Sequence, residues 1–341
     1  MSPITGHLGP RRPAARAAAL AAVLLAAAAP FGPAAPAVGA AEVVRMGDIP
    51  ALSSAGLYIA MDKGYFAEVG LQVETELFAS AGRMTPALAT GQIDVATGAP
   101  SAGLFNAIAS GMDFKVVADK GQVRPGYGGT TLIVRKDLVD SGQVKSVRDL
   151  KGREIAVGAR GIALDYFLAK AMEEVGLGYD ALKVTQLAYP DGVRALATKA
   201  IDGMWAPEPW GAQAEAQGVG VRFLPADRVK AISTFQIGVT MFSGKFMRER
   251  PEAARKFLAA YVKGARFYTE RGPKDPEVMA IVSKHTKVPV ETIQAAIPFW
   301  IAPDGRPRTE DLLAFQEFCL QQGWVKTRLP AEKIVDLSFL P

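Results

Sequence analysis

Residues 57–73 read LYIAMDKGYFAEVGLQV, and this stretch decides the fold. The segment from Gly56 to Lys63 predicts a helix, and Gly64 provides its stop because glycine readily adopts the left-handed conformation that ends helices. Leu71 to Phe78 then alternates apolar and polar residues, which is the pattern of a strand. A helix followed directly by a strand indicates an α/β fold.

Strand-like and helix-like segments alternate outward from this stretch. Strands are expected over residues 43–47, 93–96, 114–118, 131–134, 154–157, 184–188, 201–205 and 235–242. Helices are expected over residues 86–90, 101–110, 162–175 and 251–269, and residues 146–149 have the pattern of a capping box. This alternation supports the α/β class for the chain as a whole.

An internal echo suggests two related halves. Residues 87–94 read ALATGQID and residues 195–202 read ALATKAID. Both segments predict a short helix, a turn and the start of a strand at Ile-Asp. Repetition of one structural unit favours two α/β lobes, and the alternative is chance similarity in an alanine-rich chain.

The first forty residues have the pattern of a secretory signal peptide. Arg11, Arg12 and Arg16 form a positive region, Ala17 to Ala29 is apolar, and small residues lead up to Ala40. The apolar run is shorter than the roughly 20 residues that span a bilayer. We therefore expect residues 1–40 to be removed near Ala40/Ala41, by either the general secretory or the twin-arginine route, and the protein to be periplasmic.

Charge and composition argue against several classes of protein. The predicted leader contains three arginines and no acidic residue, so its removal lowers the formal net charge from +5 to +2. No run of Lys or Arg is present, which argues against nucleic-acid binding. Cys319 is the single cysteine, and His285 is the one histidine outside the leader. Neither a disulfide within the chain nor a usual zinc site can be built from them, so we expect no metal or cofactor.

The stretch 57–73 resembles the start of the nitrate, taurine and aliphatic-sulfonate substrate-binding proteins of ABC transporters. Those proteins carry a similar Ala-x-x-x-Gly-Phe/Tyr-Phe opening followed by Gly-Leu-x-Val. Further matching pieces are residues 87–95, Asp149-Leu150-Lys151-Gly152 before a strand, Glu208-Pro209-Trp210, and the proline-led helix from Pro251. The yeast-type thiamine-pyrimidine synthases share this fold.

The resemblance implies a type II periplasmic-binding fold, in which two α/β lobes are joined by two hinge crossings. By analogy, lobe one comprises residues 41–125 and 235–341, and lobe two comprises residues 126–234. A small molecule would bind in the cleft between the lobes. The implied function is that of a monomeric, non-enzymatic protein that delivers a small organic anion, such as a sulfonate or carboxylate, to an ABC transporter permease. The alternative is an exported enzyme or a sensor domain of the same fold that binds a pyrimidine-like or amine ligand.

Candidate ligand-binding residues lie in loops after strands. In open α/β sheets, ligands bind beyond the carboxyl ends of strands, where helix N-termini favour anions. The loops are residues 51–56, 79–84, 98–101, 159–162 and 189–191. Hydroxyl donors there are Ser53, Ser54 and Ser101, which could instead cap helices. Arg83 and Arg160 occupy matched positions in the two lobes and could hold an anion.

The remaining candidates are aromatic or acidic. Tyr58, Tyr127, Tyr189, Trp205 and Trp210 could form flat apolar walls or simply belong to the core. Asp191 lies in the loop before a short helix. Glu208, between two prolines, could receive a ligand amine or cap the next helix.

Two departures from the family pattern narrow the expected function and the expected ligand. The related synthases use a histidine and a cysteine cluster, which this sequence lacks, so the enzymatic branch is disfavoured. The nitrate and bicarbonate branch usually carries Gly-Glu-Pro-Trp, whereas Ala206-Pro207 precedes Glu208 here. An organic anion is therefore favoured over an inorganic one.

Overall fold

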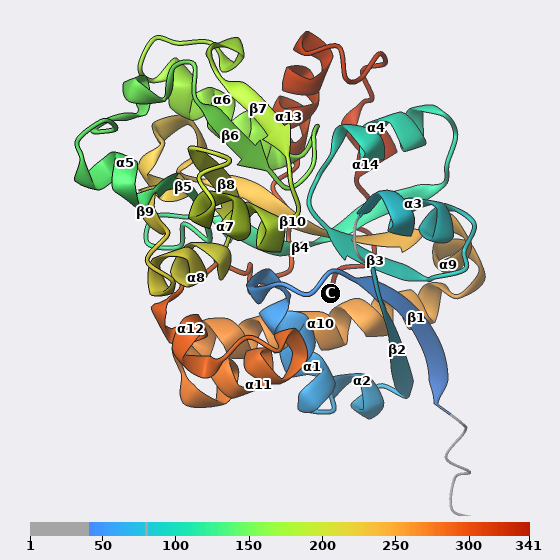
Figure 1. Ribbon diagram of the computed structural model, residues 1–341. Coiled ribbons are helices and arrows are strands. Elements are labelled where there is room, and N and C mark those ends of the chain that lie inside the picture. The colour runs from blue at the N-terminus through green and yellow to red at the C-terminus, as the bar shows by residue number, and fades with distance from the viewer. Residues whose placement is uncertain (1–40, 79–80) are drawn as a thin grey trace, which may run out of the picture. The chain divides into compact units, whose positions relative to one another are not determined.

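The computed structural model describes residues 41–78 and 81–341 (Figure 1). The predicted leader lies outside these residues, as do residues 79 and 80 of one predicted binding loop. None of the helices in the described part of the chain is long and apolar enough to cross a membrane.

The first sheet combines early strands with one late strand. It contains β1 (Glu42–Asp48), β2 (Leu71–Leu77), β3 (Val95–Gly98), β4 (Phe114–Val123) and β10 (Phe235–Ser243), in the order β2-β1-β3-β10-β4. β1 is parallel to β2 and β3, whereas β10 is antiparallel to both β3 and β4 (Figure 1). All nine residues of β10 are buried, so a strand from late in the chain completes the centre of this sheet.

The second sheet repeats this arrangement. It contains β5 (Thr130–Arg135), β6 (Glu154–Val157), β7 (Lys183–Gln186), β8 (Gly203–Pro207) and β9 (Gly220–Pro225), in the order β7-β6-β8-β5-β9. β6 is parallel to β7 and β8, and β5 is antiparallel to β8 and β9. The chain passes between the sheets at residues 124–129 and again at residues 226–234. The predicted two-lobed α/β fold with two crossings is confirmed.

The internal echo has the same structural role in each sheet. Asp94 Oδ2 accepts a hydrogen bond of 3.0 Å from the backbone N–H of Arg45, and the Asp94 N–H donates to the Arg45 carbonyl. Asp202 Oδ2 likewise accepts from the Glu154 N–H at 3.0 Å, and the Asp202 N–H donates to the Glu154 carbonyl. Each aspartate thus ties the strand that follows it to the first parallel strand of its own lobe.

Helices pack on both sheets. The lobe-one helices are η1 (Leu52–Ser54), α1 (Ala55–Asp62), α2 (Tyr65–Glu68), α3 (Ala81–Ala89), α4 (Ala102–Ala109), α9 (Gly244–Glu249), α10 (Pro251–Arg271), α11 (Pro276–Thr286), α12 (Val290–Ala295), α13 (Thr309–Gln321) and α14 (Ala331–Ile334). The lobe-two helices are α5 (Lys136–Asp140), η2 (Val147–Leu150), α6 (Ala163–Glu173), η3 (Tyr179–Ala181), α7 (Tyr189–Ala197), α8 (Trp210–Ala216), η4 (Ala226–Arg228) and η5 (Lys230–Ile232).

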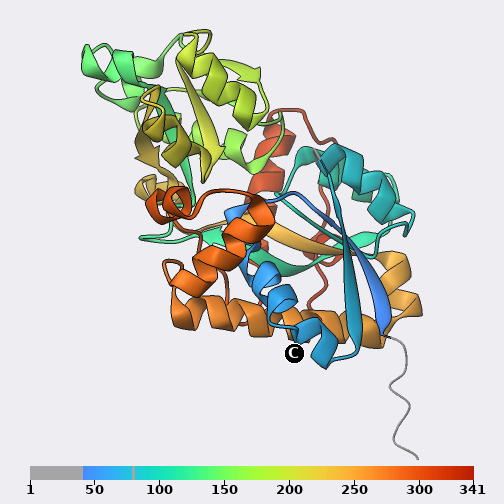
Figure 2. The same cartoon turned by 60° about the horizontal axis from the view of Figure 1, so that its bottom comes forward.

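The helical part of residues 57–73 is held in place by close helix packing. Gly264 of α10 faces α1 so closely that a Cβ there would overlap the carbonyl of Gly56. Figure 2 shows α10 running beside α1 and α2. Leu57 and Ile59 are buried as a result. The contact fixes η1 and the start of α1 at the carboxyl end of β1.

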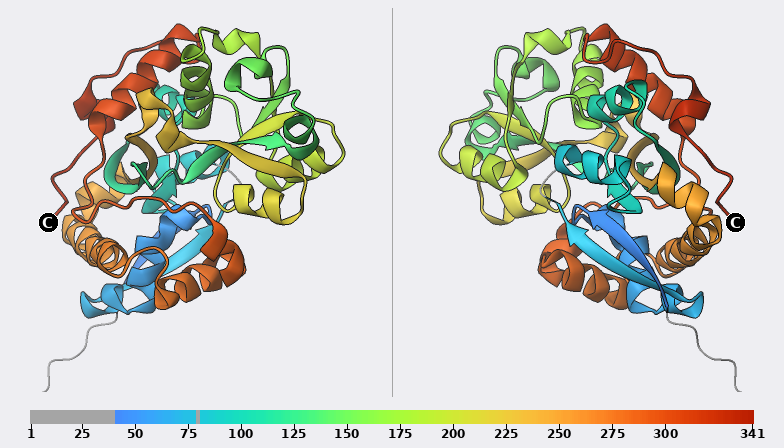
Figure 3. Two further views of the ribbon diagram at one scale, coloured as in Figure 1. Left: turned by 90° about the vertical axis from the view of Figure 1, so that its left-hand side faces the viewer. Right: turned by 90° about the vertical axis from the view of Figure 1, so that its right-hand side faces the viewer.

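Helix α13, near the C-terminus, packs against both lobes. It contacts α4 of lobe one and α6 of lobe two, and Figure 3 shows it in red beside the green elements of lobe two. The Tyr166 ring of α6 lies 5.3 Å from the Phe318 ring of α13. The resemblance implied that residues 235–341 belong to lobe one, and α13 also contacts lobe two.

Candidate functional site

Asp48, the last residue of β1, is the centre of a buried polar cluster. Its carboxylate is fully buried and accepts hydrogen bonds from Tyr58 Oη at 2.7 Å and Ser54 Oγ at 3.3 Å. The hydroxyl of Thr97 on β3 donates to the same carboxylate. Burial, followed by the Asp48 charge, raises the pKa of the Tyr58 hydroxyl, so Tyr58 remains a donor. Three hydroxyl groups therefore hold Asp48 at the carboxyl edge of the first sheet.

Lys120 of β4 reaches the same cluster. Its side chain is 4% exposed, and Nζ lies 3.6 Å from Asp48 Oδ1, which is longer than a hydrogen bond. Burial lowers the pKa of Lys120, and the Asp48 carboxylate partly opposes that effect. Ser53 of η1 is 8% exposed and packs on Gly121, the residue after Lys120. A cation thus lies beside Asp48, and Ser53 lies against the strand that carries this cation.

On lobe two, two of the predicted aromatic residues come together. Tyr189 begins α7 and Trp210 begins α8, and their ring centroids are 6.3 Å apart. The Tyr189 ring covers Gly158, where any Cβ would collide with it. Both rings are half-buried, and both follow the carboxyl ends of strands. They form an aromatic corner at the edge of the second sheet.

The other aromatic candidates are packed into the protein. Trp205 is fully buried, and its Nε1–H donates to Thr130 Oγ1 at 2.8 Å. The Tyr58 ring stacks on the His285 ring at 4.5 Å. Tyr127 meets Trp300 edge to face at 5.3 Å, beside the first crossing. The placement of Trp205 and Tyr58 favours core packing over a role as ligand walls, whereas Tyr127 is half-buried.

The candidate arginines are placed differently. Arg160 is partly exposed, and its Nη1 donates to Tyr179 Oη at 2.9 Å and lies 3.9 Å from Asp165 Oδ1. Its guanidinium also stacks over Trp324 at 5.3 Å. Arg160 therefore already has partners in lobe two and after α13. Arg83 belongs to α3, but its side chain lies outside the described residues.

Glu208, Asp191 and Ser101 have local partners. Glu208 is 1% exposed, its Oε2 accepts from the Ala212 N–H at 3.0 Å, and its Oε1 lies 3.2 Å from Arg222 Nη1. Burial raises the pKa of Glu208, while these donors lower it. Asp191 is exposed and pairs with the neighbouring Arg194. Ser101 Oγ caps α4 by accepting from the Leu104 N–H. These placements favour capping, the second role foreseen for Glu208 and Ser101.

Two of the predicted loops meet across the lobes. The Ala102 N–H donates to the Gly161 carbonyl at 2.7 Å, and the Ala163 N–H donates to the Pro100 carbonyl at 3.3 Å. Ser101 and Ile162 form an isolated antiparallel bridge at the same point. Residues 98–101 of lobe one therefore lie directly against residues 159–162 of lobe two.

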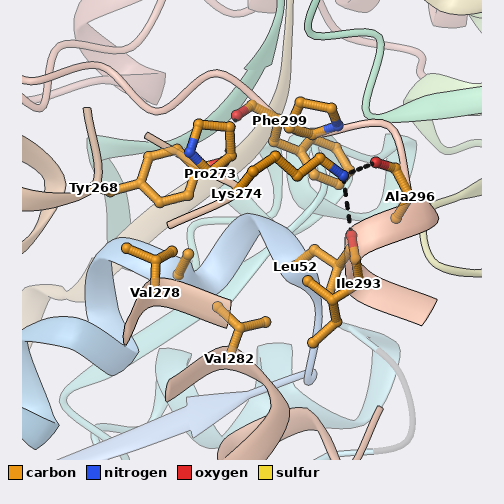
Figure 4. Close-up of a pocket in the computed structure, with 11 residues that line it drawn as sticks. Leu52, Tyr268, Pro273, Lys274, Val278, Val282, Ile293, Ala296 and Phe299 are labelled. Atoms are coloured by element: carbon orange, nitrogen blue, oxygen red, sulfur yellow. Dashed lines mark hydrogen bonds between the residues drawn. The ribbon is translucent and has the colours of Figure 1, made fainter. Parts of the chain in front are cut away.

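A small cavity lies behind η1 (Figure 4). Its volume is about 20 Å³, which holds roughly one water molecule. Apolar side chains of Leu52, Val278, Val282 and Ile293 line it, and Lys274 donates to the carbonyls of Ile293 and Ala296 at its rim. The cavity is too small for an organic ligand. In the described part of the chain, no three His, Cys, Asp or Glu side chains are placed to hold a metal ion.

Sequence reasoning missed Asp48, Thr97 and Lys120. The strand before the first crossing was expected to end at Ala118, but β4 continues to Val123 and carries Asp119 and Lys120 into the sheet. A lysine near a strand end usually lies in solvent, so its burial could not be read from the sequence. Residues 119–123 read DKGQV and have no apolar alternation, so no local signal extends the strand to Lys120.

Comparisons with known proteins agree with this fold. A provisionally named binding protein of Brucella abortus (strain 2308) is 25% identical over 245 residues, covering 69% of each chain. The ligand-binding component of an ABC-type import system from Staphylococcus aureus superposes with a TM-score of 0.73 at 17% identity, covering 87% of this chain and 97% of that one. The aliphatic sulphonate-binding protein SsuA of Escherichia coli gives 0.69 at 17% identity, with 86% and 92% covered.

An enzyme also shares the fold. The desulfurization enzyme DSZB superposes with a TM-score of 0.64 at 15% identity, covering 87% of this chain and 97% of that chain. At these identities, the solved structures establish the fold alone. The model of the NMT1-like family matches residues 39–283, most of the chain. The protein therefore belongs to the NMT1-like family.

Proposed function

We propose that this protein is an extracytoplasmic solute-binding protein that holds a small organic anion between its lobes and delivers it to the permease of an ABC-type importer. The observation that carries the proposal is the meeting of residues 98–101 with residues 159–162. These loops follow β3 and β6 at the carboxyl edges, where ligands of open α/β sheets bind. α4 and α6 begin directly after them, and helix N-termini favour anions.

The similar proteins support this class of function. The Staphylococcus aureus protein is a ligand-binding component of an import system, and the Escherichia coli protein binds aliphatic sulphonates. The aromatic corner of Tyr189 and Trp210 would suit the apolar part of such a molecule. An organic anion uses both features, which an inorganic anion would not.

The alternative is an exported enzyme or a sensor domain of the same fold. The desulfurization enzyme DSZB shows that a protein of this fold can be an enzyme. A pyrimidine-like or amine ligand would need a free acceptor. Glu208, the acceptor foreseen for it, is engaged by Arg222 and by the Ala212 N–H. This engagement favours an organic anion over a pyrimidine-like or amine ligand.

We expect the mature protein to begin near Ala41, in the periplasm, because of the leader pattern in residues 1–40. We also expect it to act as a monomer. N-terminal sequencing and sedimentation of exported protein test both expectations. Retention of residues 1–30, or a stable dimer, would contradict them.

Native mass spectrometry of freshly purified protein tests the ligand class, because a tight ligand co-purifies. Saturation with that ligand at 100 times its Kd should raise stability by about 2.7 kcal/mol. It should also reduce the radius of gyration in solution scattering if the two lobes close on it. An unchanged radius at saturation would contradict closure, and turnover of the bound compound would support the enzyme instead.

A further inference from the structure

We propose that Lys120 and Ser53 form an anion subsite at the carboxyl edge of the first sheet, and that Lys120 supplies the charge that selects the ligand. This inference rests on the proposed function and deepens it by naming the residues that hold the anionic group. The arginines foreseen from the sequence are not the basis of the subsite. Arg160 already contacts Tyr179 and Asp165.

The first argument is that the Lys120 ammonium has donors to spare. An ammonium carries three N–H groups. Among the described residues, its charged partner is Asp48 at 3.6 Å, beyond hydrogen-bond distance. Asp48 already accepts from Ser54, Tyr58 and Thr97. A buried charge that lacks hydrogen bonds is costly, so the site favours a molecule that supplies acceptors.

The second argument is that this ammonium is not fully closed off from solvent. Every side-chain nitrogen or oxygen that is sealed from solvent in the described residues has a hydrogen-bond partner. Lys120 Nζ has Asp48 at 3.6 Å and no acceptor at hydrogen-bond distance in that part of the chain, so it is not fully sealed. The hydroxyl of Ser53 meets the same two conditions, since its side chain makes no hydrogen bond within the described residues. Both groups are therefore nearly buried donors that are not fully closed off from solvent.

The third argument is location. Asp48 ends β1, and the strand register places it level with Thr97 near the end of β3. Gly238 of β10 lies between β3 and β4, and a Cβ there would be 3.4 Å from Lys120 Cβ. Because Gly238 has no side chain, the lysine stem can cross β10 toward Asp48. The ammonium thus lies at the edge of the sheet where ligands of this architecture bind.

The chemistry of the subsite selects a compact anionic group. Asp48 already accepts from three hydroxyl donors and faces a cation, which disfavours a ligand amine at this carboxylate. A lysine is a point charge without the planar fork of arginine, so it accommodates a sulfonate or a carboxylate equally. A cationic ligand would repel the Lys120 ammonium, and a neutral ligand could offer it acceptors but no opposite charge.

Calorimetry with ethanesulfonate, acetate, nitrate and sulfate tests the proposal on wild-type protein and on Lys120→Met. A charged hydrogen bond contributes enough that Lys120→Met should weaken binding of the preferred anion roughly ten- to a hundredfold. Ser53→Ala should weaken it severalfold. Lys274→Met is the matched control, because it removes a partly buried lysine of the same lobe that donates only to backbone carbonyls. The anion affinity of Lys274→Met should match that of the wild-type protein.

Ser53→Asp provides a second variant in case Lys120→Met fails to fold. A carboxylate at position 53 would pair with Lys120 and should abolish anion binding while thermal stability is kept. Wild-type binding that persists unchanged in Lys120→Met and Ser53→Asp would overturn this inference and leave the solute-binding function standing. Wild-type protein that binds none of the anions but binds a neutral or cationic compound would overturn the anion ligand of the proposed function as well.

Discussion

Trp205 shows how one hydrogen bond fixes a large side chain in the core of lobe two. Its indole N–H donates to Thr130 Oγ1, which in turn donates to the Ala206 carbonyl at 3.0 Å. The Phe167 ring packs against it at 6.1 Å. The three groups link β8, β5 and α6, so Trp205 stabilises the sheet beneath the aromatic corner of Tyr189 and Trp210.

Trp205→Phe should lower the free energy of unfolding by about 1–3 kcal/mol, because Thr130 loses its donor in a buried site. Urea denaturation measures this, and calorimetry should find anion affinity within twofold of wild type. Trp210→Phe is the counterpart on the half-buried aromatic corner, and it should alter affinity more than stability. A loss of affinity without a loss of stability in Trp205→Phe would contradict the core assignment.

At this scale the sequence identifies candidate residue types but not their directions. The sequence gives no reason to treat the aromatic residues Tyr189 and Trp205 differently. In the structure, Tyr189 covers Gly158 at the sheet edge, whereas Trp205 is buried in the core. Ser53 was foreseen as a donor, whereas Lys120 was not. The difference arises because burial of Lys120 depends on β10, which is distant in sequence.

Among the elements, the matched strands β3 and β8 carry the clearest internal symmetry. Each begins just after an aspartate that bonds to the neighbouring parallel strand, through Asp94 in lobe one and Asp202 in lobe two. Asp202 Oδ1 also lies 3.4 Å from Arg153 Nη1 and 3.7 Å from Arg135 Nη1. The echo therefore reflects a repeated structural unit, which the chance alternative does not explain.

Asp202→Ala should reduce the free energy of unfolding by about 1–3 kcal/mol, since the Glu154 N–H and two arginines lose an acceptor. Denaturation of this variant beside Asp191→Ala provides the comparison. Asp191 is exposed and pairs only with neighbouring Arg194, so its loss should cost less than about 1 kcal/mol. Equal costs for the two variants would contradict the role given to Asp202.

The sequence predicted most elements but not all their boundaries. α1, β2 and α10 fall within two residues of expectation because glycine and proline mark their ends. β9 was not foreseen, and β4 is longer than expected. These strands take their length from pairing with β5 and β10, a tertiary effect that local patterns do not contain.

For the whole molecule, Asp119 joins parts that are far apart in sequence. Its carboxylate accepts from the Ala302 N–H at 2.8 Å, from Gln236 Nε2 at 2.7 Å and from the Gly121 N–H at 3.0 Å. Tyr261 of α10 donates to its carbonyl at 2.6 Å. Burial raises the pKa of Asp119 to about 6, although these N–H donors lower it in part.

The pH dependence of stability follows from that shift. The ordinary pKa of aspartate is 3.8, so between pH 3.8 and about 6 the folded protein binds more protons than the unfolded chain. The contribution of Asp119 to the free energy of unfolding is therefore largest below pH 3.8. It falls by roughly 3 kcal/mol as the pH rises to about 6. Urea denaturation from pH 4 to pH 7 should show this slope in wild type and a weaker slope in Asp119→Asn. Equal slopes of stability against pH in wild type and Asp119→Asn would contradict this role of Asp119.

The position of β10 in the first sheet also sets the order in which the protein can assemble during synthesis. Lobe two is continuous in sequence, so all five of its strands are available once residue 225 has been made. In contrast, β3 and β4 have no central partner until residues 235–243 follow. Until then, two apolar strand edges stand open, and such edges readily pair with other chains. A chain that stops before residue 235 should therefore aggregate or be degraded, even though its second lobe is complete.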